Sequence, residues 1–315
     1  MLEKLFGQIL NTKKHIIFLI ESLIHGLKNI QECNLLKQCK SHNLMKKIIS
    51  SAFLLLFLPL FNGYQTWSLP PSKIQNEEVF GIDVSHWQGK INWRQVSEAK
   101  SFTYYQSVKK NTVKGIRKNN KIEYCFIKAT EGLHFVDKRF SQNLQGCVQY
   151  KIPRTGYHYY RFAHNPRKQA HNYINNVPRT KINLPPVIDV EYKDNEILKP
   201  SELAKKPLNK EAFVRSLTIL SNELEKHYQK KPILYTELSI YHTLIKDKFP
   251  NNPIWIREVR PVQSPNCPWL FWQFSVAKID GIVKINKKRQ YVNLVDINKF
   301  NGNKKDFNHF VNQKL

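Results

Sequence analysis

The feature that most constrains the fold is a regular alternation of short, β-rich apolar runs with longer amphipathic segments from residue 79 onward. Four of the longer segments have the apolar spacing of helices, at 137–150, 166–177, 209–228 and 239–248. The eight strand candidates are 79–84, 124–129, 155–160, 187–191, 233–236, 254–258, 270–274 and 293–297. This alternation predicts an α/β fold around a mostly parallel sheet, either closed as a barrel or open and doubly wound.

Two polar stretches, 109–121 and 284–290, do not fit the alternation, and we expect them to be loops inserted on the scaffold. Nucleotide binding has no support, because neither a GxGxxG sequence after a strand nor a GxxxxGK[ST] sequence occurs.

Acidic residues lie where the chemistry of an α/β barrel is expected, at the ends of strands. Asp83 ends the first strand, Asp189 and Glu191 end the fourth, and Asp296 ends the last. Asp189 and Glu191 are two positions apart, so both project to one side of their strand. Such close carboxylates raise one pKa, as a general acid for glycosidic cleavage requires. The alternative is that one acid is solvated and the other pairs with a lysine.

Aromatic residues gather at the same strand ends, and they suit a glycan because sugar rings present apolar C–H faces. The alternative is that they fill the barrel core. They are Tyr157 to Tyr160 in the third strand, Trp255 in the sixth, Trp272 in the seventh, and Trp87 and Trp93 after the first.

The front of the chain resembles a targeting segment rather than part of the fold. Residues 48–61 are an apolar run preceded by two lysines, which is typical of a signal peptide and short for a transmembrane helix. We therefore interpret Met45 as the initiator, 1–44 as an upstream extension, 45–63 as a signal peptide or uncleaved membrane anchor, and 64–78 as a linker. The alternative is a genuine amphipathic helix within 1–44.

The charge is strongly positive, with 50 Lys and Arg against 24 Asp and Glu, a formal net charge of +26. Such an excess favours a polyanionic partner: nucleic acid, an anionic membrane or an acidic wall polymer. The hypothesis of a nucleic-acid-binding protein is supported by the charge alone, because the sequence contains no nucleic-acid-binding motif. The five cysteines lack zinc-ligand spacing, and a bridge among Cys125, Cys147 and Cys267 is left open.

Seven segments in order resemble glycoside hydrolase family 25, the Chalaropsis-type lysozymes. They cover residues 79–302, beginning with Phe80-Gly-Ile-Asp-Val-Ser-His-Trp-Gln-Gly89 and including Pro186-Val-Ile-Asp-Val-Glu191. The others are Phe126 to Gly132, Gly156 to Tyr160, Ile233 to Thr236, Trp272-Gln273 and Val295 to Phe300. One departure is Arg257, which stands where relatives usually carry a small residue; it either binds a substrate carboxylate or narrows the site.

The resemblance implies a single flattened, irregular TIM-like (β/α) barrel over 79–315, with a substrate groove at the C-terminal ends of its strands. It implies hydrolysis of the β-1,4 bond between N-acetylmuramic acid and N-acetylglucosamine in peptidoglycan. Glu191 would be the general acid, Asp189 its partner, and Asp83 and Asp296 the rest of an acidic floor. Substrate contacts are expected from Tyr157, Tyr159, Trp255, Gln273 and Lys128.

The same resemblance implies no metal and no organic cofactor, and we expect a monomer that acts on the cell wall and does not bind nucleic acid. It would be secreted, periplasmic or otherwise in the cell envelope, with anchoring through 48–61 left open. The competing hypothesis is a barrel that binds the wall glycan but has lost activity; the four retained acids favour the enzyme.

Overall fold

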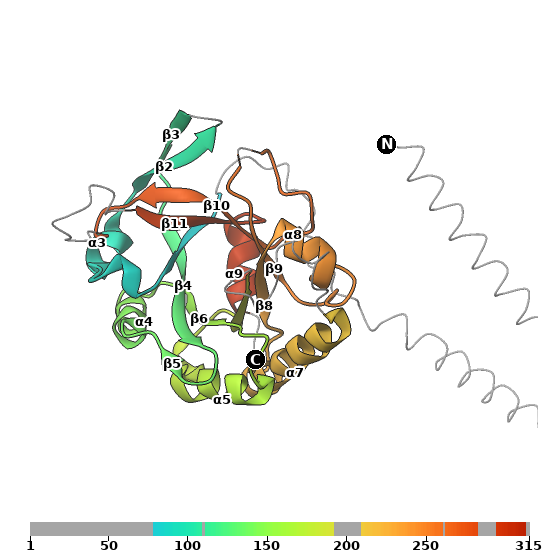
Figure 1. Ribbon diagram of the computed structural model, residues 1–315. Coiled ribbons are helices and arrows are strands. Elements are labelled where there is room, and N and C mark those ends of the chain that lie inside the picture. Colours follow the sequence, from blue (N-terminus) through green and yellow to red (C-terminus); the bar gives the residue numbers. More distant parts are fainter. Residues whose placement is uncertain (1–77, 109–110, 192–208, 261, 283–293, 313–315) are drawn as a thin grey trace, which may run out of the picture. The chain divides into compact units, whose positions relative to one another are not determined.

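The computed structural model describes residues 78–108, 111–191, 209–260, 262–282 and 294–312, all within one compact unit, Gln65–Leu315 (Figure 1). The predicted extension 1–44, the signal segment 45–63 and nearly all of the linker 64–78 lie outside the described residues. So does the expected loop at 284–290.

Eight strands form a closed barrel, which excludes the open sheet as an alternative. Each strand pairs with the next, and the last pairs with both the seventh and the first. They are β1 (Phe80–Val84), β4 (Ile122–Glu131), β6 (Arg154–Tyr159), β7 (Val187–Val190), β8 (Ile233–Glu237), β9 (Ile254–Arg257), β10 (Phe271–Lys278) and β11 (Leu294–Phe300). All eight predicted strands are present, and a short strand, β5 (Phe135–Val136), pairs with β4.

The closing strand runs against the others. β1, β4, β6, β7, β8, β9 and β10 are mutually parallel, whereas β11 is antiparallel to both of its neighbours. Asp296 therefore does not end its strand, as the sequence suggested, but lies near the beginning of β11. The reversed direction still brings it to the C-terminal ends of the parallel strands, directly opposite Asp83 on β1.

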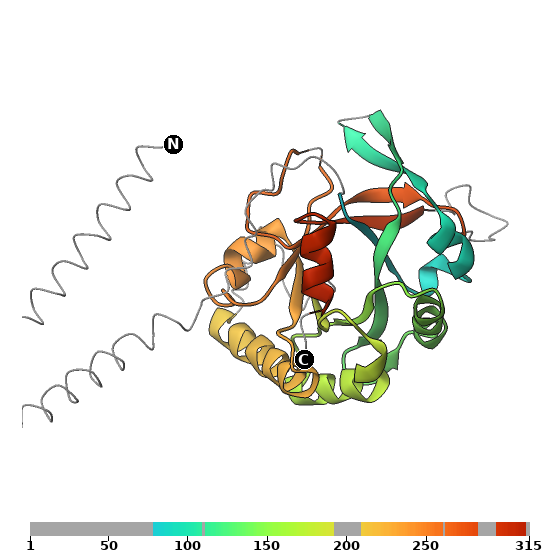
Figure 2. The same cartoon turned by 180° about the vertical axis from the view of Figure 1, so that it is seen from behind.

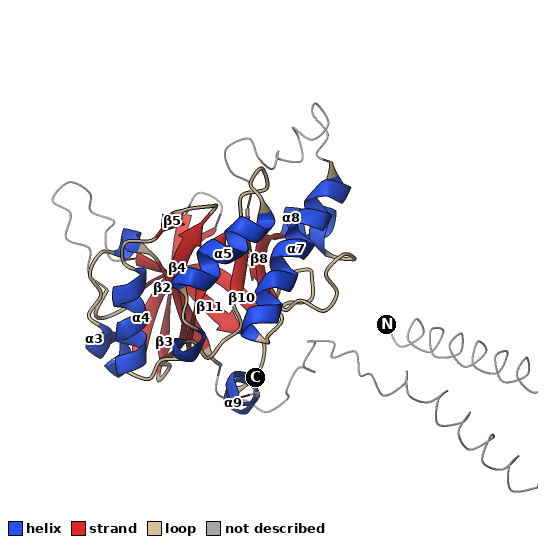
Figure 3. Ribbon diagram, turned by 90° about the horizontal axis from the view of Figure 1, so that it is seen from below, coloured by secondary structure: helices blue, strands red, loops and turns tan. Residues whose placement is uncertain are grey.

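Helices cover the outside of the barrel (Figure 3); the four predicted at 137–150, 166–177, 209–228 and 239–248 are present, whereas those at 93–98 and 304–312 are not predicted by the sequence. Asn92, Asn165 and Asn209 cap three of them by accepting a backbone N–H in the first turn. The helices are α3 (Trp93–Glu98), α4 (Phe140–Gln149), α5 (Pro166–Asn176), α7 (Lys210–Tyr228), α8 (Leu238–Ile240) with the π-helical η5 (Tyr241–Ile245), and α9 (Lys304–Asn312), besides the 3-10 turns η3 (His86–Gln88) and η4 (Arg179–Lys181). Among the helices described, none is both long and apolar enough to cross a bilayer.

The expectation of a loop at 109–121 is wrong for most of that stretch. β2 (Ser101–Val108) and β3 (Asn111–Lys118) form an antiparallel hairpin that pairs through β2 with β10 and projects from the barrel (Figure 1). The polar composition of β3 concealed its strand, because β3 lies at the edge of the sheet and is largely exposed. Among the hairpin side chains that the structure describes, Phe102 alone is buried, and Tyr104 packs at the barrel surface with its ring centroid 5.6 Å from that of Phe274.

Two apolar layers result from the alternation of side chains along each strand. The outward side chains of the strands pack against the helices, for example against Leu217 and Leu224 of α7. The inward residues fill the lower half of the barrel with aromatic rings, among them Tyr124, Phe126 and Phe271. Helix α9 covers this end of the barrel, as Figure 2 shows from behind, and its Phe307 belongs to the same buried cluster of rings.

Gly81 on β1 makes the dense interior possible. A Cβ atom at this position would lie 2.3 Å from the ring of Tyr124, which is fully buried and cannot move aside. Any other residue would displace β1 or this ring, two positions before Asp83.

Candidate active site

Above the aromatic layer, the inward positions of the same strands are polar, and they enclose an open cavity of about 440 Å³. The cavity lies at the C-terminal ends of the parallel strands, as predicted. The residues that line it are Asp83, Ser85, Trp87, Lys128, Tyr157, Tyr159, Asp189, Glu191, Tyr235, Glu237, Trp255, Arg257, Gln273 and Asp296.

All nine site residues predicted from the sequence lie in this lining: the acids Asp83, Asp189, Glu191 and Asp296, and the expected substrate contacts Tyr157, Tyr159, Trp255, Gln273 and Lys128. Other aromatic residues expected at the groove are elsewhere. Trp93 is buried in α3, and Trp272 and Tyr160 belong to the outer layer. Trp272 and Tyr160 each stand one position away from an inward-facing residue, so their side chains point to the opposite face of the sheet.

The floor of the cavity is a fixed network of hydrogen bonds around Asp83. Its Oδ2 accepts hydrogen bonds from Gln273 Nε2 at 3.0 Å and from Asn298 Nδ2 at 2.8 Å. The Tyr235 hydroxyl donates to Gln273 Oε1 at 2.9 Å, and Trp255 Nε1 donates to Asn298 Oδ1 at 2.7 Å. Because each amide is held by a donor on its other side, both amides present N–H groups to the carboxyl group of Asp83.

Burial dominates the protonation of the floor. It raises the pKa of Asp83 to about 8, with the charge of Asp296 adding to the increase and the two amide hydrogen bonds opposing it. Burial also raises the pKa of Asp296 to about 6, against the lowering influence of Arg257. Near neutral pH the floor therefore holds a proton that a solvated pair of aspartates would release.

Asp189 and Glu191 extend from β7 toward the same cavity. Burial and then the charge of Glu191 raise the pKa of Asp189 well above its ordinary value. The pKa of Glu191 is also raised, mainly by burial, although the nearby Tyr235 hydroxyl and the charges of Arg257 and Lys128 oppose this. The Oδ1 atom of Asp189 is buried and has no hydrogen-bond partner among the described residues, so an incoming N–H group would satisfy it.

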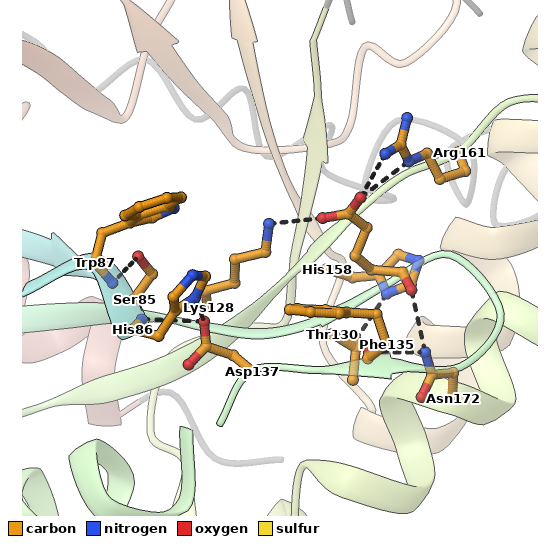
Figure 4. Close-up of polar contacts among 11 residues, drawn as sticks. Ser85, His86, Trp87, Lys128, Thr130, Phe135, Asp137, His158, Arg161 and Asn172 are labelled. Atoms are coloured by element: carbon orange, nitrogen blue, oxygen red, sulfur yellow. Dashed lines mark hydrogen bonds and ion pairs between the residues drawn. The ribbon is translucent and has the colours of Figure 1, made fainter. Parts of the chain in front are cut away.

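One wall of the cavity carries a lysine whose position is set by a residue outside the lining. Lys128 Nζ lies 2.8 Å from Glu131 Oε2, and Arg161 donates to the other oxygen at 2.6 and 3.1 Å (Figure 4). Burial alone would raise the pKa of Glu131, but the hydrogen bonds and charges of these two cations lower it below its usual value. Both cations also approach the ring of Tyr159, at 5.0 and 5.3 Å from its centroid.

Beside this wall, after the neighbouring strand β1, the rim presents an indole ring held by a capped helical turn. Trp87 lines the cavity and is 66% exposed, in the single turn η3 that Ser85 caps. The His86 ring lies 4.8 Å from the indole ring, and His86 Nδ1 is 2.6 Å from the buried carboxylate of Asp137 (Figure 4). The capped turn and the His86 contacts thus keep a large apolar ring exposed to solvent beside the acidic residues of the cavity.

Sequence reasoning missed Ser85, Tyr235 and Glu237 as lining residues and left the role of Arg257 open. Glu237 and Arg257 stand opposite each other on β8 and β9, and Arg257 donates to Glu237 Oε1 at 3.1 Å. Both lie two positions after an inward residue, Tyr235 and Trp255 respectively, so the period of two along each strand would have placed them on the inner face.

The described part of the chain contains no group of three His, Cys, Asp or Glu residues placed to hold a metal ion. Cys125, Cys147 and Cys267 are free thiols in the structure, the first two buried behind the barrel wall.

The model of the family described as glycosyl hydrolases family 25 matches residues 82–282, which include every strand from β4 to β10 and most of β1. The chain belongs to glycosyl hydrolase family 25. It is therefore a glycoside hydrolase, and the resemblance seen in the sequence is confirmed.

Relatives of this family 25 hydrolase agree in sequence and in fold. YegX of Escherichia coli strain K12 is 30% identical over 236 residues, 74% of this chain and 73% of its own length. Lysozyme M1 of Streptomyces globisporus is 28% identical over 243 residues, 71% of this chain and 68% of its own.

Among solved structures, a family 25 glycosyl hydrolase from Bacillus anthracis is 32% identical with a TM-score of 0.56, covering 76% of this chain and 96% of that one. A bacterial lysozyme from Streptomyces coelicolor is 25% identical with a TM-score of 0.57, covering 76% of this chain and all of that one. The barrel of this chain is thus the lysozyme barrel of the family.

Proposed function

We propose that this family 25 hydrolase is a peptidoglycan hydrolase that cleaves the β-1,4 bond between N-acetylmuramic acid and N-acetylglucosamine. The observation that carries the proposal is the pair Asp189 and Glu191, which shares one face of β7 in an acidic cavity and has raised pKa values. The lysozymes among the relatives support the choice of substrate.

In the proposed reaction, protonated Glu191 donates its proton to the glycosidic oxygen as the bond from that oxygen to C1 breaks. The positive charge that develops at C1 is stabilised either by Asp189 or by the acetamido oxygen that Asp189 orients. The unpartnered Oδ1 of Asp189 suits the second role, because it can accept the acetamido N–H. Water then adds to C1, and its released proton restores Glu191.

The other lining residues would hold the sugar in place. Asp83 and Asp296 form the floor, and the rings of Tyr157, Tyr159 and Trp255 offer apolar faces to the glycan. Lys128 and Gln273 supply donors for its hydroxyl and acetamido oxygens. We further propose that the protein works outside the cytoplasm, secreted or in the envelope, on the wall as its partner; the segment 48–61 that would target or anchor it lies outside the described residues.

Digestion of purified peptidoglycan with mass analysis of the fragments tests the proposal. The wild type should release reducing ends that carry N-acetylmuramic acid. Glu191→Gln should lower the rate by about 10²–10⁴-fold without unfolding the protein, because a general acid contributes that much. Glu223→Gln is the matched control, since Glu223 lies on α7, outside the cavity lining, and pairs with Arg167.

Three results would contradict the proposal in different ways. Normal activity of Glu191→Gln would remove Glu191 from the role of general acid. Fragments that end in N-acetylglucosamine would contradict the choice of bond. Binding of the wall by the wild type without any release would favour the inactive, glycan-binding barrel.

A further inference from the structure

Two cations flank the acidic pair symmetrically. The strand order is β4, β6, β7, β8, β9, so Lys128 on β4 and Arg257 on β9 each stand two strands from Asp189 and Glu191 on β7. A carboxylate holds each cation: Glu131 lies 2.8 Å from Lys128, and Glu237 lies 3.1 Å from Arg257.

The two pairs differ in their access to a ligand. The side chains of Lys128 and Glu131 are 14% and 17% exposed, and Glu131 also binds Arg161. The side chains of Arg257 and Glu237 are 40% and 37% exposed. Among the described residues, the guanidinium of Arg257 makes one hydrogen bond, through a single nitrogen. Arg257 thus presents further N–H donors to the cavity, whereas Lys128 is enclosed.

The charge around Arg257 permits an anion to approach. Five carboxyl groups line the cavity, but burial raises the pKa of Asp189, Glu191 and Asp296, and it raises that of Asp83 to about 8, so that Asp83 keeps its proton near neutral pH. The cavity is consequently less negative than its composition implies. A guanidinium in these surroundings binds a carboxylate through parallel N–H donors, which an ammonium cannot offer.

We propose that Arg257 is a specificity-determining residue that binds a carboxylate of the glycan next to the cleaved bond. The chemical group that fits is the lactyl carboxylate of N-acetylmuramic acid, which is free where the residue carries no stem peptide and which N-acetylglucosamine lacks. Arg257 therefore selects acidic glycan over neutral chains of N-acetylglucosamine, and Glu237 holds the guanidinium in place until the ligand arrives. The choice of ligand rests on the proposed function.

Binding without turnover tests this inference. The probes are two tetrasaccharides of equal length, one of alternating N-acetylglucosamine and N-acetylmuramic acid with free carboxylates, the other of N-acetylglucosamine alone. Titration calorimetry at about pH 6 uses protein that carries Glu191→Gln. Adding Arg257→Ala should weaken binding of the acidic probe about tenfold or more, the size expected for a lost charge-assisted hydrogen bond, and change the neutral probe less than twofold.

Two further variants sharpen the result. Arg260→Ala is the matched control, because Arg260 also pairs with a glutamate, Glu258, but lies outside the cavity lining; it should leave both affinities unchanged. Arg257→Lys keeps the charge and loses the planar fork, so its affinity for the acidic probe should fall between those of the wild-type residue and alanine.

Equal losses for both probes, or no loss for either, would overturn the inference, and so would an effect of Arg260→Ala as large as that of Arg257→Ala. The outcome is separate from that of the digestion experiment. Charge selectivity in a protein that releases no fragments would keep the role of Arg257 and reject the proposed function, whereas hydrolysis without selectivity would do the reverse.

Discussion

Asp83 shows how a functional residue can weaken the fold that holds it. Its carboxyl group is 8% exposed and its pKa is about 8, against an ordinary value of 3.8. Between those values the folded protein binds more protons than the unfolded chain, so stability is fully present at low pH and decreases as the pH rises toward 8. The loss follows from desolvation and the neighbouring charge of Asp296.

Asp83→Asn should remove that loss. We expect the variant and the wild type to have similar free energies of unfolding near pH 4, and the variant to be more stable by on the order of 2–5 kcal/mol near pH 8, since each pKa unit corresponds to about 1.4 kcal/mol. Urea titrations at both pH values measure the difference. The exposed Asp280→Asn serves as control, and a stability gain independent of pH would contradict the explanation.

Trp87 is highly exposed and is held by the capped turn η3, so its indole ring is suited to stacking on a sugar ring. Trp87→Ala should raise the KM for soluble glycan strands about three- to tenfold, the effect of losing one aromatic stacking contact, while the thermal midpoint stays nearly unchanged. Steady-state kinetics and a thermal scan test both statements. Ile116→Ala is the control, because Ile116 is 56% exposed but lies on the distant β3 hairpin strand; an unchanged KM for Trp87→Ala would exclude the stacking role.

At the scale of elements, α9 is responsible for closing the lower end of the barrel. Phe307 is fully buried, with its ring centroid 5.3 Å from that of Tyr124 and 5.2 Å from that of Phe300. Phe307→Ala should lower the free energy of unfolding by about 3–5 kcal/mol, because it opens a cavity among rigid rings. Denaturant unfolding measures this loss.

The same variant should keep the kcat of the protein that remains folded, because α9 and the acidic cavity lie at opposite ends of the barrel. Phe135→Ala, at a side chain that is 45% exposed, should cost far less stability. A large drop in kcat at a temperature where Phe307→Ala is fully folded would show that the two ends are coupled.

The sequence was sufficient for the eight barrel strands and four helices, but not for α3, α9, the hairpin β2–β3 or the direction of β11. Buried strands such as β7 are recognisable as continuous apolar runs, and the longer helices by their apolar spacing. The hairpin gave no such signal, because β3 is mostly polar and β2, although it contains Phe102 and two tyrosines, has no continuous buried run. The direction of β11 was equally hidden, since an antiparallel strand has the same composition as a parallel one.

The candidate site was predictable in its acids and less so in its rim. Asp83, Asp189, Glu191 and Asp296 were found because their motifs are local. Arg257 and Glu237 meet only through the register of β8 with β9, and Glu131 reaches the cavity through its contact with Lys128 and through its charge. Contacts of this kind depend on tertiary placement, which periodicity does not supply.

On the scale of the whole molecule, the positive charge belongs mainly to the hydrolase unit. Residues 1–63 hold eight lysines and three acidic residues, which leaves +21 on residues 64–315. The acids of the cavity thus belong to a unit of strongly positive net charge, which would attract an anionic wall over a distance and present carboxyl groups where the glycan enters.

Salt should separate these two functions of charge. Raising NaCl from about 50 to about 300 mM should reduce sedimentation with intact wall about tenfold or more, because it screens the many exposed lysines. Cleavage of a short soluble fragment should change less than about threefold. Co-sedimentation and fragment kinetics at the two concentrations test this, and equal salt sensitivity of both would assign wall binding to the cavity instead.

The antiparallel closure has a consequence for the time course of folding. Asp83 receives a hydrogen bond from Asn298, 215 residues later in the chain, and another from Gln273, 190 residues later. Contacts of such high sequence separation form slowly, because the entropy of a long loop is lost before they are gained. A nascent chain can pair β4 through β9 while it is still being made, but the acidic floor cannot assemble until β11 has been synthesised. We therefore expect the acidic floor to be completed only late in folding, and a chain that ends before β11 to be inert toward glycan.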